Sequence, residues 1–86
     1  MGNAVMRYAE QLRAGRALLD WSQDQLAEQA SVGVATIRRM ESQSGLIGGS
    51  SRSVWALQEA LERGGVVFLN DEDDLGAGVR LAKRAG

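Results

Sequence analysis

The chain has 86 residues, 44% of them hydrophobic, and its 10 basic and 11 acidic side chains give a formal net charge of −1. A chain of this length forms one small domain around a single modest core, so a large internal cavity is not expected. The absence of cysteine and histidine excludes disulfides, thiolate metal sites, a cysteine nucleophile and a histidine base. We therefore expect a protein that is not an enzyme and that binds no metal and no cofactor.

The charges are unevenly distributed along the chain. Four of the 11 acidic residues form the run DEDD at residues 71–74, so the rest of the chain is mildly basic. Since fields are largely screened beyond about 10 Å at moderate salt, a basic surface elsewhere can still attract a polyanion. The run does not fit an EF-hand calcium loop, because Leu75 takes a ligand position and Ala82 replaces the closing glutamate. A solvated turn that protects a sheet from mispairing is the preferred interpretation.

The hydropathy pattern does not indicate a membrane protein. No apolar run is long enough to cross a bilayer, and the N-terminus lacks the basic start and apolar block of a secretory signal. We therefore expect a cytoplasmic protein without membrane association.

A first helix is predicted over roughly residues 4–19. Five residues recur there at helical spacing, and all but the arginine are apolar: Val5, Ala9, Leu12, Arg16 and Leu19. The side chain of Arg16 either extends along this apolar stripe to water or forms a partly buried ion pair. The periodicity alone leaves both interpretations open.

A second helix is predicted over about residues 22–30. Ser22 and Gln25 fit the capping box S-x-x-Q, in which each side chain accepts a hydrogen bond from the other residue's backbone N–H. Trp21 and Leu26 fit the hydrophobic staple that flanks such a cap. Only residues 31–33 separate this helix from the next, which is the spacing of a helix-turn-helix.

A third helix is predicted over about residues 33–42, with Ile37 and Met40 facing inward. Its outward face combines small side chains with guanidinium groups: Val34, Ala35, Arg38 and Arg39. Small residues let a helix approach the floor of a DNA groove, and arginine is the commonest partner of guanine. The same residues fit a solvated basic helix face equally well.

A fourth helix is predicted over about residues 51–63, after a polar segment rich in glycine and serine. Its first N–H groups, the hydroxyls of Ser50, Ser51 and Ser53 and the charge of Arg52 together predict an anion site. A flexible loop without a ligand is the alternative. The sequence leaves open whether Trp55 closes the core or lies partly exposed.

The C-terminal part is predicted to form two antiparallel strands, at residues 66–69 and 79–83, around a loop. Because an isolated hairpin is marginally stable in water, it must pack on the helices, pair with a second chain, or both. We expect residues 1–65 to form the helical domain and residues 66–86 to form a dimerisation element. The interface would include the apolar residues of both strands: Val66, Val67, Phe68, Leu69, Val79 and Leu81.

The stretch WSQDQLAEQASVGVATIRRME, which covers both central helices, resembles the helix-turn-helix of the lambda-repressor-like (Cro/CI or XRE-type) transcription regulators. Their pattern is [LW]-[ST]-Q-x-x-L-A-x-x-x-G-V-[ST]-x-x-T-[IV]-x-x-[LMI]-E. Ten residues match it: Trp21, Ser22, Gln23, Leu26, Ala27, Val32, Thr36, Ile37, Met40 and Glu41. The later sequence GVVFL...GVRL resembles a small bacterial subgroup that ends in a β-hairpin. The resemblance implies a mainly α fold with four to five helices and a C-terminal two-stranded hairpin.

The resemblance also implies roles for individual residues. Base reading in the major groove falls to the first turns of the third helix: Gly33, Val34, Ala35, Thr36 and Arg39. Phosphate contacts are expected from five others: Gln23, Arg38, Ser50, Ser51 and Arg52. Members often pair an arginine of the first helix with the glutamate that closes the third, which implies a structural ion pair between Arg16 and Glu41.

Two residues of the turn depart from the family pattern. Ser31 stands where the family has glycine, and Gly33 stands where it has a capping serine or threonine. A positive φ at Ser31 would carry a modest strain, and glycine in place of a capping hydroxyl costs only a few tenths of a kcal/mol. We expect the turn to form with a weaker phosphate contact at residue 33.

The sequence therefore predicts a bacterial, cytoplasmic, sequence-specific double-stranded DNA-binding transcription regulator, nucleoid-associated when bound. We expect a homodimer that reads a palindromic operator through the major groove, and a repressor in preference to an activator. The alternative is an antitoxin or antiactivator that uses the hairpin to bind a partner protein. No residues are left over for a small-molecule effector domain.

Overall fold

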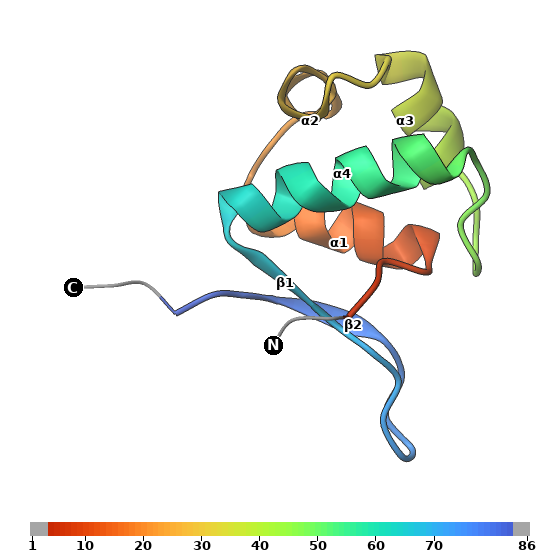
Figure 1. Ribbon diagram of the computed structural model, residues 1–86, viewed down its shortest axis with the longest axis vertical. Helices are drawn as coiled ribbons and strands as arrows, with labels where there is room; N and C mark the ends of the chain where they lie inside the picture. Colours follow the sequence, from red (N-terminus) through yellow and green to blue (C-terminus); the bar gives the residue numbers. More distant parts are fainter. Residues whose placement is uncertain (1–3, 84–86) are drawn as a thin grey trace.

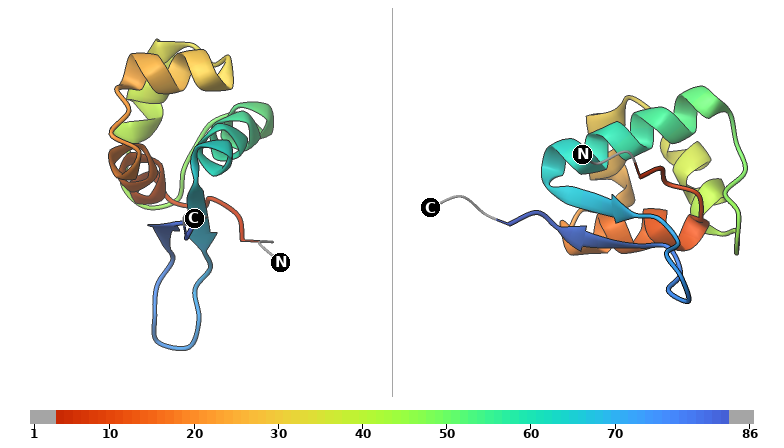
Figure 2. Two further views of the ribbon diagram at one scale, coloured as in Figure 1. Left: turned by 90° about the vertical axis from the view of Figure 1, so that its left-hand side faces the viewer. Right: turned by 60° about the horizontal axis from the view of Figure 1, so that its bottom comes forward.

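The structure is a computed structural model that describes residues 4–83 and consists of four helices followed by a two-stranded antiparallel hairpin (Figure 1). The elements are α1 (Ala9–Leu18), α2 (Gln23–Ala30), α3 (Val34–Glu41), α4 (Ser51–Gly64), β1 (Val66–Leu69) and β2 (Gly78–Leu81). The mainly helical architecture with a C-terminal hairpin confirms the coarse fold prediction. Figure 2 shows that the hairpin loop projects away from the helices. Within residues 4–83, no helix combines the length and apolar character that crossing a bilayer requires.

The first helix begins at Ala9, so the prediction that it starts at residue 4 is wrong. The preceding segment is extended because two buried glutamines hold its backbone. Gln58 Oε1 accepts the Met6 N–H at 2.9 Å, while Gln11 Oε1 accepts the Tyr8 N–H at 3.0 Å. Val5, predicted to lie on the buried stripe, is 44% exposed. These polar contacts satisfy the amides of the segment without helical hydrogen bonds.

The turn between α2 and α3 is formed by residues 31–33. At the start of α2, Ser22 Oγ accepts the Gln25 N–H at 3.0 Å and Gln25 Oε1 accepts the Ser22 N–H at 2.7 Å, which confirms the predicted capping box. Ser31 ends this helix in the left-handed region with φ 56°. Gly33 has φ −61° and ψ 140° and caps α3 without a side chain. Any L-residue adopts this extended conformation, so the special geometry lies at Ser31.

The hairpin packs one of its faces on the helices. Its register pairs Val66 with Leu81 and Phe68 with Val79, and Gln11 Nε2 donates to the Gly78 carbonyl at 3.1 Å. Val66 and Phe68 are only 2% and 3% exposed, because they belong to the chain's own core. Little of their surface is left for a second chain, and their place in a dimer interface stays a prediction. The remaining predicted interface residues are half-buried or exposed: Val67, Leu69, Val79 and Leu81.

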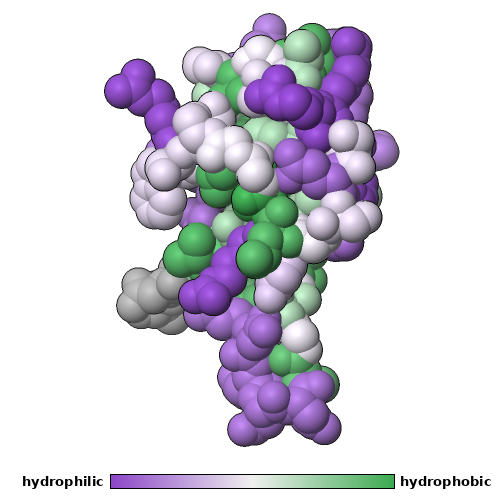
Figure 3. All heavy atoms as spheres, turned by 90° about the vertical axis from the view of Figure 1, so that its right-hand side faces the viewer, coloured by the Kyte–Doolittle hydropathy of each residue, from purple (hydrophilic) through white to green (hydrophobic). Residues whose placement is uncertain are grey.

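The loop of the hairpin ends in a narrow acidic tip, defined here as residues 71–75. Glu72 and Leu75 exchange backbone hydrogen bonds of 2.9 and 2.8 Å around Asp73, which has φ 53°. All five residues are exposed. Figure 3 shows that this end of the molecule is largely hydrophilic, whereas apolar residues gather nearer the middle of the same face.

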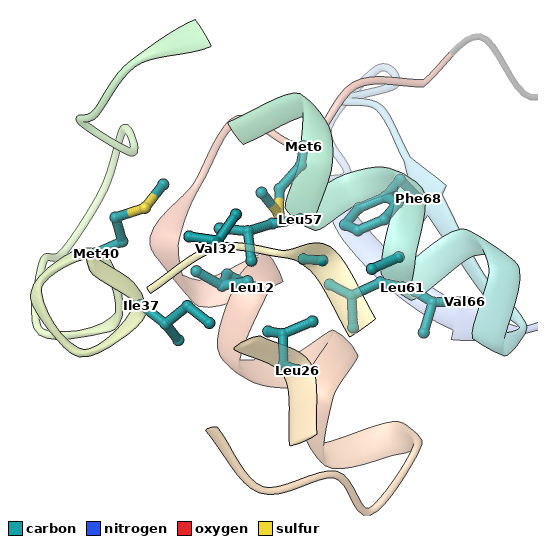
Figure 4. Packing of buried hydrophobic residues seen from close by; sticks show 12 residues of the cluster. Met6, Leu12, Leu26, Val32, Ile37, Met40, Leu57, Leu61, Val66 and Phe68 are labelled. Carbon is teal, nitrogen blue, oxygen red and sulfur yellow. The ribbon is translucent and has the colours of Figure 1, made fainter. Parts of the chain in front are cut away.

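The core is built by all four helices and the inner face of the hairpin (Figure 4). Each helix contributes at least one fully buried side chain: Leu12 from α1, Leu26 from α2, Ile37 and Met40 from α3, and Leu57 and Leu61 from α4. Burying one such side chain contributes about 1.5 to 3 kcal/mol. Trp55 lies outside this cluster and is 54% exposed.

Candidate nucleic-acid interface

The residues predicted to read bases lie at the start of α3, except for Arg39, which lies in its last turn. Gly33, Ala35 and Arg39 are exposed, and Val34 and Thr36 are half-buried. The opposite face of α3 is anchored by Ile37 and Met40, both 0% exposed. The outward face of α3 therefore consists of Ala35, Arg38 and Arg39, all of them exposed.

The start of α3 is uncrowded. A Cβ atom placed on Gly33 would have no neighbour within 4 Å, and no side chain caps the helix. The first N–H groups of a helix attract anions when no side chain satisfies them. A phosphate group, or the backbone of an approaching polyanion, therefore has direct access to this end of α3.

Three exposed arginines lie on α3 and α4. Arg38 and Arg39 project from α3, and Arg52 projects from the first turn of α4; all three are exposed. Both helices begin after an extended residue, Gly33 in one case and Ser50 in the other. Both helices thus carry exposed guanidinium groups, which suit a polyanion.

The hydroxyl of Ser50 is used within the protein, contrary to its predicted role as a free phosphate donor. It accepts the Ser53 N–H at 3.1 Å and donates to Ser53 Oγ at 3.0 Å. This arrangement caps α4. Ser51 and Arg52 stay exposed and are the side chains of this turn that a phosphate can reach.

Arg16 and Glu41 form the predicted ion pair, and it is bidentate. Arg16 Nε donates to Glu41 Oε2 and Arg16 Nη2 to Glu41 Oε1, each at 2.8 Å. Arg16 Nη1 also donates to the Trp21 carbonyl at 2.9 Å. Gln23 Nε2 donates to Glu41 Oε1 at 3.0 Å. The four residues therefore join α1, the start of α2 and the end of α3.

The electrostatics of Glu41 follow from this network. Burial raises the pKa of its carboxyl group, but the hydrogen bonds from Arg16 and Gln23 and the charges of Arg16 and Arg13 outweigh burial and lower the pKa below its ordinary value. The hydrogen bonds that Arg16 donates to Glu41 in turn raise the pKa of Arg16. Both groups are therefore charged at neutral pH.

Two arginines have a structural role that the sequence interpretation missed. Arg13 Nη1 donates to the carbonyls of Glu41 and Gln43, so its positive charge sits at the C-terminal end of α3. Arg63 Nη2 donates to the Gln29 carbonyl at 2.9 Å near the end of α2. The position of Arg13 one helical turn before Arg16 was an available signal, because the two share a helix face.

Comparison with protein-family models and with curated protein sequences gives no match to this chain. Within residues 4–83, no three acidic side chains lie close enough together to hold a metal ion. The candidate site is therefore described by its own geometry.

Proposed function

We propose that this protein is a sequence-specific double-stranded DNA-binding transcription regulator, with α3 as its recognition helix. The observation that carries the proposal is the outward face of α3, where small residues and Arg39 are exposed while Ile37 and Met40 anchor the opposite face. A helix of this kind fits the major groove of B-DNA, which is about 12 Å wide.

The network around Glu41 supports the proposal because recognition requires a rigid helix. Glu41 closes α3 and is held by Arg16 and Gln23 through three hydrogen bonds. These bonds connect the end of α3 to α1 and to the first residue of α2. A recognition helix held at its far end presents its first turns in a constant orientation.

Phosphate contacts on both sides of α3 are part of the proposal. Arg38 and Arg52 are exposed, as is Ser51 at the start of α4. Gln23 lies at the start of α2, and its bond to Glu41 orients the amide group. Phosphate contacts position the protein, whereas contacts to base edges carry the sequence information.

The net charge of −1 is compatible with this function. The acidic tip lies at the opposite end of the molecule from α2 and α3 (Figure 1). Its repulsion with a duplex bound at α3 is therefore weakened by salt screening, which acts over about 8 to 10 Å under cellular conditions.

A homodimer that acts as a repressor completes the proposal. One α3 contacts only a few base pairs, whereas two copies about 34 Å apart read both halves of a palindrome. The test is selection of bound duplexes from a random DNA library. We expect enrichment of one palindromic sequence with half-sites about 10 base pairs apart.

The matched variants for this selection are Arg39→Ala on α3 and Arg80→Ala on β2, both at exposed arginines. Arg39→Ala should reduce enrichment, while Arg80→Ala should retain it. Absence of any enriched sequence with the unmodified protein, or equal loss with both variants, contradicts the proposal.

A second candidate is an antitoxin or antiactivator that binds a partner protein through the hairpin. It is favoured by the exposure of Leu81 on β2, whose side of the hairpin adjoins Leu18. This candidate predicts a stoichiometric complex with one partner protein. Leu81→Asp should abolish that complex and leave the enrichment of DNA sequences unchanged. If the Leu81→Asp variant still forms the complex with unchanged affinity, the hairpin is not the site that binds the partner protein.

A further inference from the structure

An apolar groove opens between residues 5–7, the loop that joins α3 to α4, and α4 itself. Its volume is about 530 Å³, and most of its lining is hydrophobic: Val5, Met6, Leu46, Ile47, Val54 and Trp55. Val5, Leu46 and Trp55 are 44%, 71% and 54% exposed. Arg7 is the only charged group among the described residues that line the groove. Large apolar side chains gathered at the surface mark an interaction site.

A complementary feature lies on the hairpin. Leu75 is 68% exposed and sits on the acidic tip, directly after four consecutive carboxylate side chains. The paired backbone hydrogen bonds between Glu72 and Leu75 hold this tip in one shape. The chain therefore carries an ordered apolar knob with negative charge and, separately, an apolar groove with positive charge.

The base of the hairpin loop, but not its tip, lies beside the groove. Asn70, at the base of the hairpin loop, accepts a hydrogen bond through Oδ1 from the Val5 N–H at 3.3 Å. The tip nevertheless points away from its own groove, which no residue of the hairpin lines.

We infer that the acidic tip of one copy occupies the groove of a second copy, and that the reciprocal contact forms in the same dimer. Leu75 packs against Leu46 and Trp55 of the other copy, and the tip carboxylates face Arg7. Such mutual pairing is the isologous contact of a two-fold dimer. The inference deepens the dimer part of the proposed function and rests on that function only for its role on DNA. Ser51 also lines the groove, so in this dimer the phosphate contacts fall to Arg38 and Arg52, which do not line it.

A second copy is the occupant that accounts for both features. A small apolar molecule would fill the groove but leave Leu75 exposed on the tip. Nucleic acid would satisfy Arg7 but would place a charged backbone against Leu46 and Trp55, at a cost in desolvation. The negative tip and the Arg7-bearing groove have opposite charge, which favours their association with each other.

Sedimentation velocity at micromolar concentration, without DNA, tests this contact with two variants. Leu75→Asp removes the knob and leaves the groove intact, while Trp55→Glu removes the groove and leaves the knob intact. Both side chains are more than half exposed, so the helical circular dichroism should not change. Each variant alone should dimerise about tenfold more weakly or worse, as expected for an interface hot spot.

The decisive sample is an equimolar mixture of the two variants. A mixed dimer contains one intact knob in one intact groove, so the mixture should dimerise more tightly than either variant alone and less tightly than the unmodified protein. Leu46→Glu, at a residue that is 71% exposed, serves as a second groove variant if Trp55→Glu fails to fold.

The inference is overturned if the mixture is as monomeric as each variant alone. It is also overturned if Leu75→Asp dimerises normally or if the unmodified protein is monomeric. If the unmodified protein dimerises and enriches a palindrome while Leu75→Asp has no effect, the proposed function survives and only this contact fails. If knob and groove pair as described but no DNA sequence is enriched, the proposed function fails alone.

Discussion

Arg16 and Glu41 bind each other through two hydrogen bonds of 2.8 Å that connect the last turn of α1 to the last residue of α3. The carboxylate side chain is 5% exposed and the guanidinium side chain 24%. Glu41 therefore depends on Arg16 for charge compensation, and the orientation of α3 depends on both.

Replacing Arg16 with Met should destabilise the protein strongly. Removing one partner of a buried ion pair leaves the other uncompensated and costs about 3 to 5 kcal/mol. The free energy of unfolding is measured by urea denaturation. Arg38→Met, at an exposed residue of α3, is the matched control and should change stability by about 0.5 kcal/mol or less. Similar losses in both variants would show that the ion pair is not structural.

Stability should decrease in acid. The pKa of Glu41 is lowered in the folded protein, so the stabilising contribution is fully present above the unfolded value of about 4.3 and is lost as pH falls through the folded pKa. We expect the free energy of unfolding to decline below about pH 5. Denaturation at a series of pH values measures this slope.

Glu41→Gln is the variant that isolates this effect, and its decline in acid should be shallower. The free energy of unfolding of this variant still depends to some degree on pH, because the pKa of Glu10 is also lowered. Its cause is the hydrogen bonds from the backbone N–H groups of Glu10 itself and of Gly45. An unchanged slope in Glu41→Gln would assign the acid sensitivity to other carboxylates.

Exchanging the two unusual residues of the turn should stabilise the protein. Ser31 has φ 56°, and the left-handed region costs a residue with a Cβ roughly 1 to 2 kcal/mol, which Ser31→Gly relieves in part. Gly33→Ser adds a capping hydroxyl at an uncrowded position, worth a few tenths of a kcal/mol. The double variant should show a higher Tm in a thermal melt. The control is Ser44→Gly, at a loop residue without positive φ, which should lower Tm or leave it unchanged. If Ser31→Gly and Ser44→Gly change Tm by the same amount, Ser31 is not strained in the turn.

Arg39→Ala and Arg52→Ala should weaken DNA binding in different ways. Loss of a bidentate contact to guanine costs about 1 to 3 kcal/mol and relaxes preference at one base pair. Loss of a phosphate contact weakens cognate and random duplexes alike and makes binding less dependent on salt. Competition binding with cognate, singly substituted and random duplexes separates the two. If both variants lose the same factor on every duplex, the division into base-reading and phosphate-contacting residues fails.

The sequence by itself determined the local features of this fold. Ser22 and Gln25 lie three residues apart, so their mutual cap follows from the chain itself. The short link at residues 31–33 and the inward spacing of Ile37 and Met40 were likewise readable from the sequence, as was the hairpin. Contacts of this kind depend on neighbouring residues and on hydrophobic periodicity.

Only the tertiary structure decided where the first helix begins and which apolar residues are buried. Gln58 reaches the backbone of Met6 across 52 residues of sequence, and Gln11 reaches Gly78 across 67. These distant hydrogen bonds keep the N-terminal segment extended and place the hairpin against the helices, which buries Phe68. Hydrophobic periodicity in one segment carries no information about a partner that lies so far along the chain. A backbone amide that bonds to a distant side chain is therefore recognised only once the elements are packed together, and so is an apolar face that a distant strand covers.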